Sequence, residues 1–184
     1  MSNTTPEFLT PAEAAHRLRV SPITLRSWAE KGLIQVQVTA GGHRRYPLAE
    51  IERLLQRQRQ PENSPLRIMV VDDDPFILAL LQKFLSSQVT PVSIETANDG
   101  FEAGRKLASF KPDVLLLDLM MPKMDGFDVC RQIKNDPATA FIRVIAMSGN
   151  PDQENVERIL SLGAETCLSK PIDTAELLTT LGLD

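Results

Sequence analysis

The stretch Ile68-Met69-Val70-Val71-Asp72-Asp73-Asp74 decides how most of this 184-residue chain folds. Four apolar residues, three of them β-branched, run directly into three carboxylates, a pattern typical of a buried strand that ends at a polar edge. An apolar helical face over residues 75–87 follows, and strand and helix then alternate to residue 181. About five βα units in succession predict an α/β fold, an open parallel sheet with helices on both faces.

Polar side chains follow four of the expected strands. The strands are expected at residues 68–71, 92–97, 113–117, 143–147 and 166–169, and the helices at 75–87, 100–110, 126–135, 152–162 and 173–181. The polar groups are, in strand order, Asp72 with Asp73 and Asp74, then Asp118, Ser148 and Lys170. Because reactive groups in open parallel sheets collect at the carboxyl ends of the strands, we expect these side chains to converge on one crevice.

This set of side chains suits phosphoryl chemistry. Closely packed carboxylates repel one another unless a cation lies among them, and several oxygen ligands with room for water suit Mg²⁺. Lys170 would add positive charge, and the Ser148 hydroxyl could donate a hydrogen bond. Since a carboxylate can itself act as a nucleophile, the residues predict a Mg²⁺-dependent site that phosphorylates an aspartate. The alternative is that each aspartate only caps a helix or a loop, which would make the meeting of these groups at four strand ends a coincidence.

The motifs of this region resemble the receiver domain of two-component response regulators. They are Val70-Val71-Asp72-Asp73-Asp74, Asp118-Leu119-Met120-Met121-Pro122-Lys123-Met124-Asp125-Gly126, Ser148-Gly149 and Lys170-Pro171. The resemblance covers residues 66–184. It implies a flavodoxin-like (CheY-like), doubly wound, five-stranded parallel sheet with the strand order 2-1-3-4-5.

The resemblance also implies a role for each position. Asp118 would accept phosphate from a histidine kinase or a histidine phosphotransfer protein, and Ser148 and Lys170 would contact the phosphoryl group. The Mg²⁺ ligands would be Asp118, Asp73 directly, Asp72 mainly through water, and the backbone carbonyl of Met120. Asp74 would be a loop residue. No independent enzymatic activity is expected, because self-dephosphorylation is part of receiver behaviour.

One position departs from this family. Receiver domains usually carry Tyr or Phe three residues before the lysine, as the rotating partner of the hydroxyl that Ser148 supplies here. This chain has Cys167 there, which we interpret as a small buried core residue rather than a redox sensor. The departure puts the usual aromatic rotation in doubt and leaves phosphorylation untouched. Output could instead come from the loop after Ser148 and the helix at 152–162.

The charge of the chain is divided unevenly. Residues 1–60 hold nine Lys and Arg against five Asp and Glu, a balance of +4, whereas the remaining residues hold eleven against nineteen, a balance of −8. This asymmetry favours two domains with different partners. We place a DNA-binding domain at residues 1–59, a polar linker at 60–65 and the receiver at 66–184.

The basic segment predicts a small winged helix-turn-helix. We expect helices at 9–18, 22–31 and 48–59 and paired strands at 33–39 and 43–46, with N-caps at Thr10 and Ser21. The second helix would enter the major groove, and the hairpin would form the wing. Candidate DNA contacts are Ser21, Thr24, Arg26 and Ser27 on the helix, and His43, Arg44, Arg45 and Tyr46 on the wing. Tyr46 could instead pack beneath the wing, Leu25 and Trp28 are expected in the core, and the arginine pair alone could be a solvated pair.

The stretches Leu9-Thr10-Pro11-Ala12-Glu13-Ala14-Ala15 and Gly41-Gly42-His43-Arg44-Arg45-Tyr46 resemble the MerR-like and excisionase-like DNA-binding domains. The resemblance covers roughly residues 8–56 and implies sequence-specific binding to double-stranded DNA. The helix at 48–59 is too short for the dimerising coiled coil of full MerR regulators. The module is therefore similar to the compact variety.

Composition limits the setting in which the protein works. No stretch approaches the roughly 18 apolar residues of a membrane helix, and no secretory signal is evident, so we expect no membrane partner and a cytoplasmic location. The two cysteines, Cys130 and Cys167, match no metal-ligand spacing.

Two functions from different classes fit the sequence. One is a DNA-binding response regulator controlled by phosphorylation of Asp118, and the other is a phosphorylation-dependent switch whose N-terminal module docks a protein. Phosphorylation could pair two chains in a homodimer, or it could release the basic module from the acidic receiver.

Overall fold

The computed structural model describes residues 8–18, 20–58, 64–122 and 124–183, with the backbone alone for residues 56–58. The chain folds into two compact units, one of Met1–Glu62 with Lys134–Phe141 and one of Asn63–Ile133 with Ile142–Asp184. Residues 60–63 of the predicted linker lie outside the described residues. Within the described part of the chain, no helix is long and apolar enough to cross a membrane.

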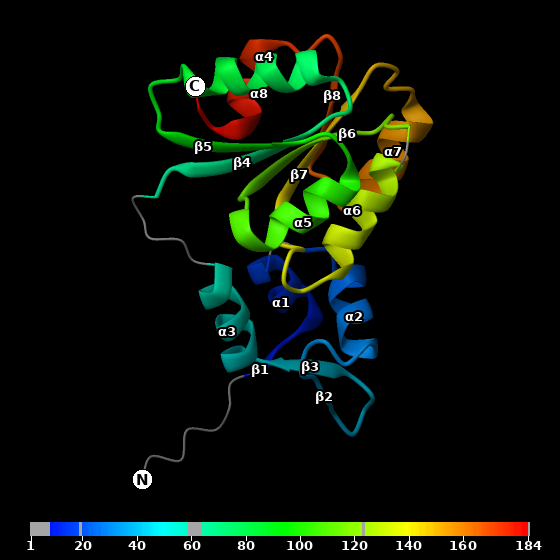
Figure 1. Cartoon of the computed structure of the whole chain (residues 1–184). Coiled ribbons are helices and arrows are strands. Elements are labelled where there is room, and N and C mark those ends of the chain that lie inside the picture. The colour runs from blue at the N-terminus through cyan, green and yellow to red at the C-terminus, as the bar shows by residue number, and fades with distance from the viewer. Residues whose placement is uncertain (1–7, 19, 59–63, 123, 184) are drawn as a thin grey trace. The chain divides into compact units, whose positions relative to one another are not determined.

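The second unit is built on a five-stranded parallel sheet (Figure 1). Its strands are β4 (Leu66–Val71), β5 (Val92–Ala97), β6 (Val114–Asp118), β7 (Arg143–Ser148) and β8 (Thr166–Ser169). They lie in the order β5-β4-β6-β7-β8, which confirms the predicted order 2-1-3-4-5. Asp118 lies beside Met147, and Ser148 lies beside Ser169, so neighbouring strands end at one edge.

Five helices cover the two faces of this sheet. They are α4 (Pro75–Ser86), α5 (Gly100–Phe110), α6 (Gly126–Asn135), α7 (Gln153–Ser161) and α8 (Thr174–Leu181), with α4 and α8 over one face and α5 and α6 over the other in Figure 1. Asp74, Asp99, Asp152 and Asp173 are N-caps, and each accepts a hydrogen bond from a backbone N–H of the first turn. The helices expected to begin at Asp152 and Asp173 therefore begin one residue later.

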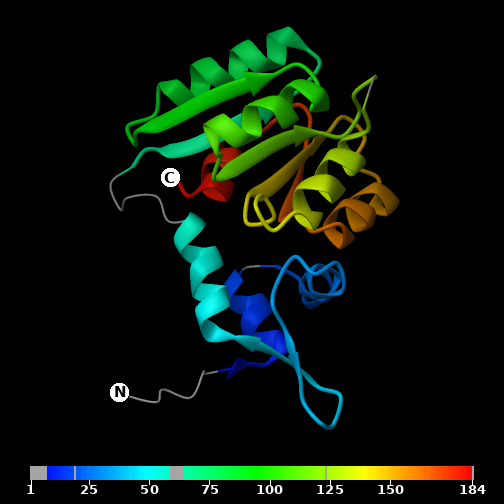
Figure 2. The ribbon, with the colours of Figure 1, turned by 60° about the horizontal axis from the view of Figure 1, so that its bottom comes forward.

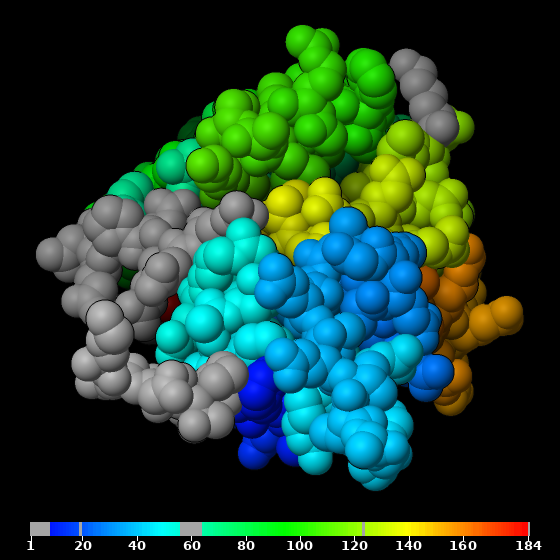
Figure 3. All heavy atoms as spheres, turned by 90° about the horizontal axis from the view of Figure 1, so that it is seen from below, coloured from blue at the N-terminus to red at the C-terminus, as the bar shows by residue number. Residues whose placement is uncertain are grey.

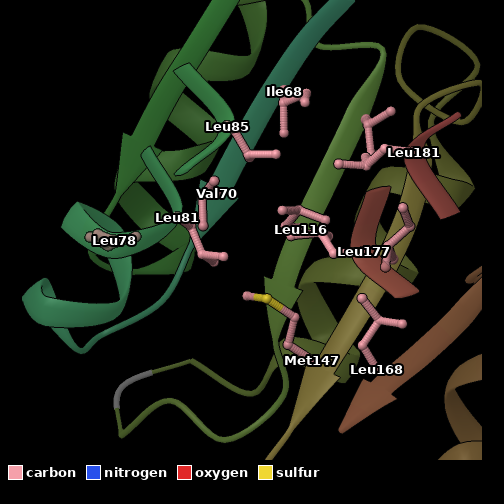
Figure 4. Close-up of a cluster of buried hydrophobic side chains, with 12 residues drawn as sticks. Ile68, Val70, Leu78, Leu81, Leu85, Leu116, Met147, Leu168, Leu177 and Leu181 are labelled. Atoms are coloured by element: carbon pink, nitrogen blue, oxygen red, sulfur yellow. The ribbon is translucent and has the colours of Figure 1, made fainter. Parts of the chain in front are cut away.

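The core between the sheet and the layer of α4 and α8 is almost entirely aliphatic (Figure 4). Its buried side chains are Leu78, Leu81 and Leu85 of α4, Leu177 and Leu181 of α8, and Ile68, Val70, Val114, Leu116, Ile145, Met147 and Leu168 of the strands. The leucines of each helix recur at helical intervals, so they lie on one side of it. Burying each large side chain contributes about 1.5–3 kcal/mol, and this packing fixes the strands whose ends carry the polar groups.

The first unit contains three helices and a small antiparallel sheet. The helices are α1 (Pro11–Leu18), α2 (Pro22–Glu30) and α3 (Leu48–Gln58), and the strands are β1 (Phe8–Leu9), β2 (Gln37–Val38) and β3 (Arg44–Pro47), in the order β1-β3-β2. The core includes Leu18, Leu25, Trp28, Ile34, Tyr46 and Ile51. Figure 2 shows the hairpin of β2 and β3 extending away from the helices.

Both predicted helix caps of this unit are present. The Thr10 hydroxyl accepts the Glu13 N–H at 3.3 Å, and the Glu13 carboxylate accepts the Thr10 N–H at 2.7 Å. The Ser21 hydroxyl accepts the Thr24 N–H at 3.0 Å. These contacts confirm the capping box and the second cap, each worth about 1 kcal/mol.

Two local predictions for this unit are wrong. The strand expected at 33–39 contracts to the two residues of β2, because Ile34 turns into the core and is buried there. The helix expected from Leu9 begins only at Pro11, and Leu9 pairs instead with Tyr46 as part of β1. Pro11 disfavours a helical backbone at the preceding Thr10, which explains why the helix begins no earlier than Pro11.

Candidate functional site

The carboxyl ends of β4 and β6 place three carboxylates together. Asp72 directly follows β4, Asp118 is the last residue of β6, and both are buried, whereas Asp73 is exposed. One carboxylate oxygen of each lies within 4.8 Å of the others. Oxygen atoms at this spacing, at the rim of a buried site, match the ligand preference of a hard divalent cation.

Lys170, which follows β8, supplies the positive charge at this cluster. Its Nζ lies 2.7 Å from Asp72 Oδ2 and 3.0 Å from Asp118 Oδ1. Burial raises the pKa of Asp72, and the hydrogen bond from Lys170 only partly offsets this effect. Burial also opposes the charge of Lys170, but the hydrogen bonds to Asp72 and Asp118 leave the pKa of Lys170 raised overall. The ammonium group is thus the counter-ion of both buried carboxylates.

Ser148 and Met120 complete the set of predicted site residues. Ser148 is buried at the end of β7, where its hydroxyl accepts the Asn150 N–H at 3.2 Å. A hydroxyl that accepts one hydrogen bond can still donate its own proton to another group. Met120 lies in the loop after β6 and is 67% exposed. Its carbonyl remains a predicted ligand.

Cys167 occupies the position where an aromatic ring was expected from the family resemblance. It lies on β8 and is partly buried. Burial raises the pKa of the Cys167 thiol, which disfavours the reactive thiolate. This environment favours the packing role over redox sensing.

Contacts that the sequence did not reveal link α7 to the start of α6 and to the loop after Asp118. The Arg158 guanidinium of α7 lies over the Phe127 ring, 4.0 Å from its centroid. Arg158 also lies 3.7 Å from the Asp125 carboxylate. These residues are about thirty positions apart in the chain, too far for any local pattern to pair them.

Gly126 allows this loop to fold back against its own strand. A Cβ at Gly126 would collide with the Asp118 carbonyl oxygen and would lie 2.7 Å from the Leu119 Cα. Both atoms belong to the backbone and cannot move aside without shifting the end of β6. The absence of a side chain at Gly126 is therefore a condition for the position of Asp118.

We expect Gly126→Ala to lower the free energy of unfolding of the second unit by about 1–3 kcal/mol, because the extra methyl group overpacks the backbone. Urea denaturation would measure the change. The matched control is Gly104→Ala on α5, where an added Cβ meets nothing within 4 Å. That variant should be more stable than the wild type by about 0.5–1 kcal/mol. Equal effects of the two substitutions would contradict the steric argument.

The four predicted helix contacts with DNA lie on or beside α2. Ser21 caps the helix, and its hydroxyl also pairs with the Thr24 hydroxyl at 2.8 Å. Ser27 is partly buried, whereas the Arg26 side chain is 67% exposed. Arg26 is thus the one charged residue among these four, and its guanidinium group is open to solvent.

The wing residues divide into surface and core. His43 is exposed next to Gly42, whose φ of +77° favours glycine in the turn. Arg44 and Arg45 are partly exposed on β3. Tyr46 is fully buried in the core, so its predicted contact with a DNA phosphate is corrected to the packing role. Apolar burial fixes the ring beneath the wing, and the hydroxyl cannot reach solvent.

Glu30 connects the helix to the wing and was missed by the sequence analysis. Its Oε1 accepts hydrogen bonds from Arg26 Nε at 2.9 Å and from Arg44 at 3.2 Å. Figure 3 shows α2 and the hairpin side by side on one surface. The spacing of four residues between Arg26 and Glu30 is readable from the sequence, but the contact with Arg44 is not.

Comparisons with known proteins match both units. A family model of the response regulator receiver domain matches residues 68–182, and one of a helix-turn-helix domain matches residues 8–59. Over 111 residues the chain is 42% identical to response regulator PleD of Caulobacter vibrioides. This aligned region is 60% of this chain and 24% of PleD. Over 112 residues it is 33% identical to the DNA-binding dual master transcriptional regulator RpaA of Synechocystis. This aligned region is 61% of this chain and 46% of RpaA. The chain thus spans less than half the length of these two relatives.

A solved receiver-domain structure is similar to about two thirds of this chain. It is the signal receiver domain of a DNA-binding response regulator protein (merR) from Colwellia psychrerythraea 34H, with 44% sequence identity and a TM-score of 0.61. The match covers 64% of this chain and 95% of that one. Chemotaxis protein CheY4 of Vibrio cholerae, at 27% identity and a TM-score of 0.61, covers 65% of this chain.

Proposed function

Because this chain belongs to the response regulator receiver family, we propose that it is a DNA-binding response regulator that accepts a phosphoryl group on Asp118. The observation that carries the proposal is the placement of Lys170 between two buried carboxylates at the strand ends. A cap or a loop aspartate would need no such counter-ion. The matched helix-turn-helix domain supports DNA as the target of the output.

The proposed chemistry uses groups at the strand ends. A carboxylate oxygen of Asp118 attacks phosphorus, and the bond from phosphorus to the imidazole nitrogen of a histidine kinase or phosphotransfer protein breaks, leaving an acyl phosphate. Lys170, 3.0 Å from Asp118, stays close to the added negative charge. The buried Ser148 hydroxyl donates a hydrogen bond to a phosphoryl oxygen.

The acidic cluster would hold Mg²⁺ through Asp72, Asp73, Asp118 and the Met120 carbonyl. Its oxygen atoms and their spacing fit a hard cation that keeps part of its hydration shell. When bound, Mg²⁺ supplies positive charge against the phosphoryl oxygens. The exposed Asp73 would be the ligand that incoming metal and water reach first.

Metal binding should stabilise the protein through these ligands. At about a hundredfold excess over its Kd, Mg²⁺ should raise the free energy of unfolding by about 2.7 kcal/mol, because it binds the folded state alone. Asp73→Asn removes a ligand on the surface and should lose most of this gain. Asp74→Asn is the matched control, since Asp74 caps α4 and asparagine caps equally well. Thermal melts with and without Mg²⁺ would measure the shifts, and an equal Mg²⁺ response in both variants would exclude Asp73 as a ligand.

Selection of DNA sequences tests the proposed function as a whole. The full chain would be presented with random duplexes, with and without beryllofluoride plus Mg²⁺ as a stable phosphoryl mimic. We expect one enriched motif whose affinity changes with the mimic. A homodimer formed on phosphorylation would enrich paired half-sites, whereas release of a covered module would enrich a single site.

An exposed apolar side chain on α2 is the observation behind the second candidate, the protein-docking function. Ile23 at the start of α2 is 80% exposed, and an apolar side chain there could contact either a thymine methyl group or a protein partner. The same selection separates the two functions. Absence of any enriched motif, with or without the mimic, would favour the protein-docking switch.

A further inference from the structure

Glu30 holds two arginines from different elements at one oxygen atom. Arg26 lies one turn earlier on α2 and Arg44 begins β3, yet both guanidinium groups donate to Glu30 Oε1, at 2.9 Å and 3.2 Å. The Glu30 side chain is 50% exposed, so this cluster faces solvent. The hydrogen bond from Arg26 is the main reason that the pKa of Glu30 is lowered, and the carboxylate is therefore charged at neutral pH.

Stability of the fold does not account for this arrangement. Exposed ion pairs add little to the free energy of unfolding. Glu30 is also the last residue of α2, where a negative charge is unfavourable beside the unpaired carbonyl groups of the helix end. A cationic or neutral side chain at this position would stabilise the end of α2 more than Glu30 does.

The geometry instead resembles a complex between arginines and an anion. Two guanidinium groups that converge on one carboxylate oxygen can converge equally on one phosphate oxygen, which offers the same charge and acceptor character. Both arginines are among the residues predicted from the sequence to contact DNA. A backbone phosphate at this point would bind where Glu30 Oε1 lies now.

We propose that Arg26 and Arg44 form a single site for one DNA backbone phosphate, and that Glu30 occupies this site as an internal counter-anion until DNA displaces it. The proposal rests on the proposed DNA-binding function and adds a regulating residue to it. Glu30 lowers the affinity of the free protein for any duplex, because the phosphate must replace a carboxylate that already satisfies both arginines. It also reduces the salt dependence, since it cancels one of two positive charges.

The test compares two variants of the full chain, each of which replaces one glutamate by the neutral glutamine. Glu30→Gln should bind a short duplex about threefold to tenfold more tightly at low salt, the range expected for releasing exposed charge pairs. Its advantage should shrink between about 50 mM and about 200 mM salt. Glu52→Gln is the matched control, because Glu52 is an exposed glutamate on α3 and the change in net charge is the same. Fluorescence anisotropy of a labelled duplex would give the affinities, and circular dichroism would verify that the variants are folded.

A second comparison isolates the two arginines. Glu30→Gln is repeated in the background Arg26→Ala with Arg44→Ala, where the gain in affinity should vanish. An equal gain for Glu52→Gln, or a gain that persists without the arginines, would overturn the proposal in favour of a general charge effect. Weaker binding by Glu30→Gln would overturn it too, because Glu30 would then orient the arginines for DNA. If the wild type and every variant fail to bind duplex even at about 50 mM salt, the proposed DNA function falls together with this inference.

Discussion

Asp118→Asn should take up no phosphoryl group when the protein is incubated with Mg²⁺ and acetyl phosphate, whereas the wild type should be labelled. The amide of asparagine is neutral and is not a nucleophile at this position, so no acyl phosphate can form. The substitution keeps the shape of the side chain, and its amide oxygen can still accept the hydrogen bond from Lys170, at 3.0 Å in the wild type. The loss should therefore concern chemistry rather than folding.

Intact-protein mass spectrometry would measure this result directly. Asp74→Asn provides the control, because it makes the same chemical change two residues from Asp72 in a side chain that caps α4. Labelling of Asp74→Asn should equal that of the wild type. Undiminished labelling of Asp118→Asn would move the phosphoacceptor to another carboxylate, of which the exposed Asp73 is the first to test.

Lys170→Met should lower the free energy of unfolding by about 3 kcal/mol at neutral pH without metal. The substitution preserves most of the side-chain volume but removes the one cation that the described residues place against the buried Asp72 and Asp118. This estimate is at the lower end for a broken buried pair, because the Lys170 side chain is 21% exposed and water can reach it. Urea denaturation in the presence of a chelator would measure the difference.

The dependence of this loss on pH follows from Asp72. Burial already raises the pKa of Asp72 in the folded wild type, and removal of the Lys170 hydrogen bond that opposes this effect should raise it further. The folded variant therefore binds a proton more readily than the unfolded chain does, and its deficit should shrink as the pH falls through this raised pKa. Lys83→Met on the exposed side of α4 is the control and should change stability by less than about 0.5 kcal/mol. A deficit equal to that of the control would mean that Lys170 does not compensate the buried charges.

The sequence predicted the second unit well because its signals are periodic and local. Apolar runs such as Ile68–Val71 identify buried strands without reference to the rest of the chain. Parallel strands end at a common edge, so knowing where each strand ends was sufficient to bring Asp72, Asp118, Ser148 and Lys170 together.

The first unit was harder to predict because its strands are short. A strand of two residues, such as β1 or β2, carries no periodicity, and its pairing partner alone defines it. The sequence could not predict whether Tyr46 is buried or exposed. β3 has only four residues, and the alternation of polar and apolar side chains along it is too short to show which face points inward. The contacts of Arg44 with Glu30 and of Arg158 with Phe127 join different elements, and only the folded structure reveals them.

The contacts of Arg158 have a thermodynamic consequence for signalling. They join α7 to Phe127 at the start of α6 through a cation–π contact and to Asp125 in the loop after Asp118 through an ion pair. Cys167 stands in this domain where the family usually carries an aromatic ring. If occupancy of the acidic pocket alters the free energy of these contacts, linkage requires the reverse effect to be equally large. A ligand that binds α7 would then change the affinity of the pocket for a phosphoryl mimic by some factor. The mimic would change the affinity of α7 for that ligand by the same factor. Under that condition, binding at α7 and occupancy of the pocket would influence each other through the contacts of Arg158.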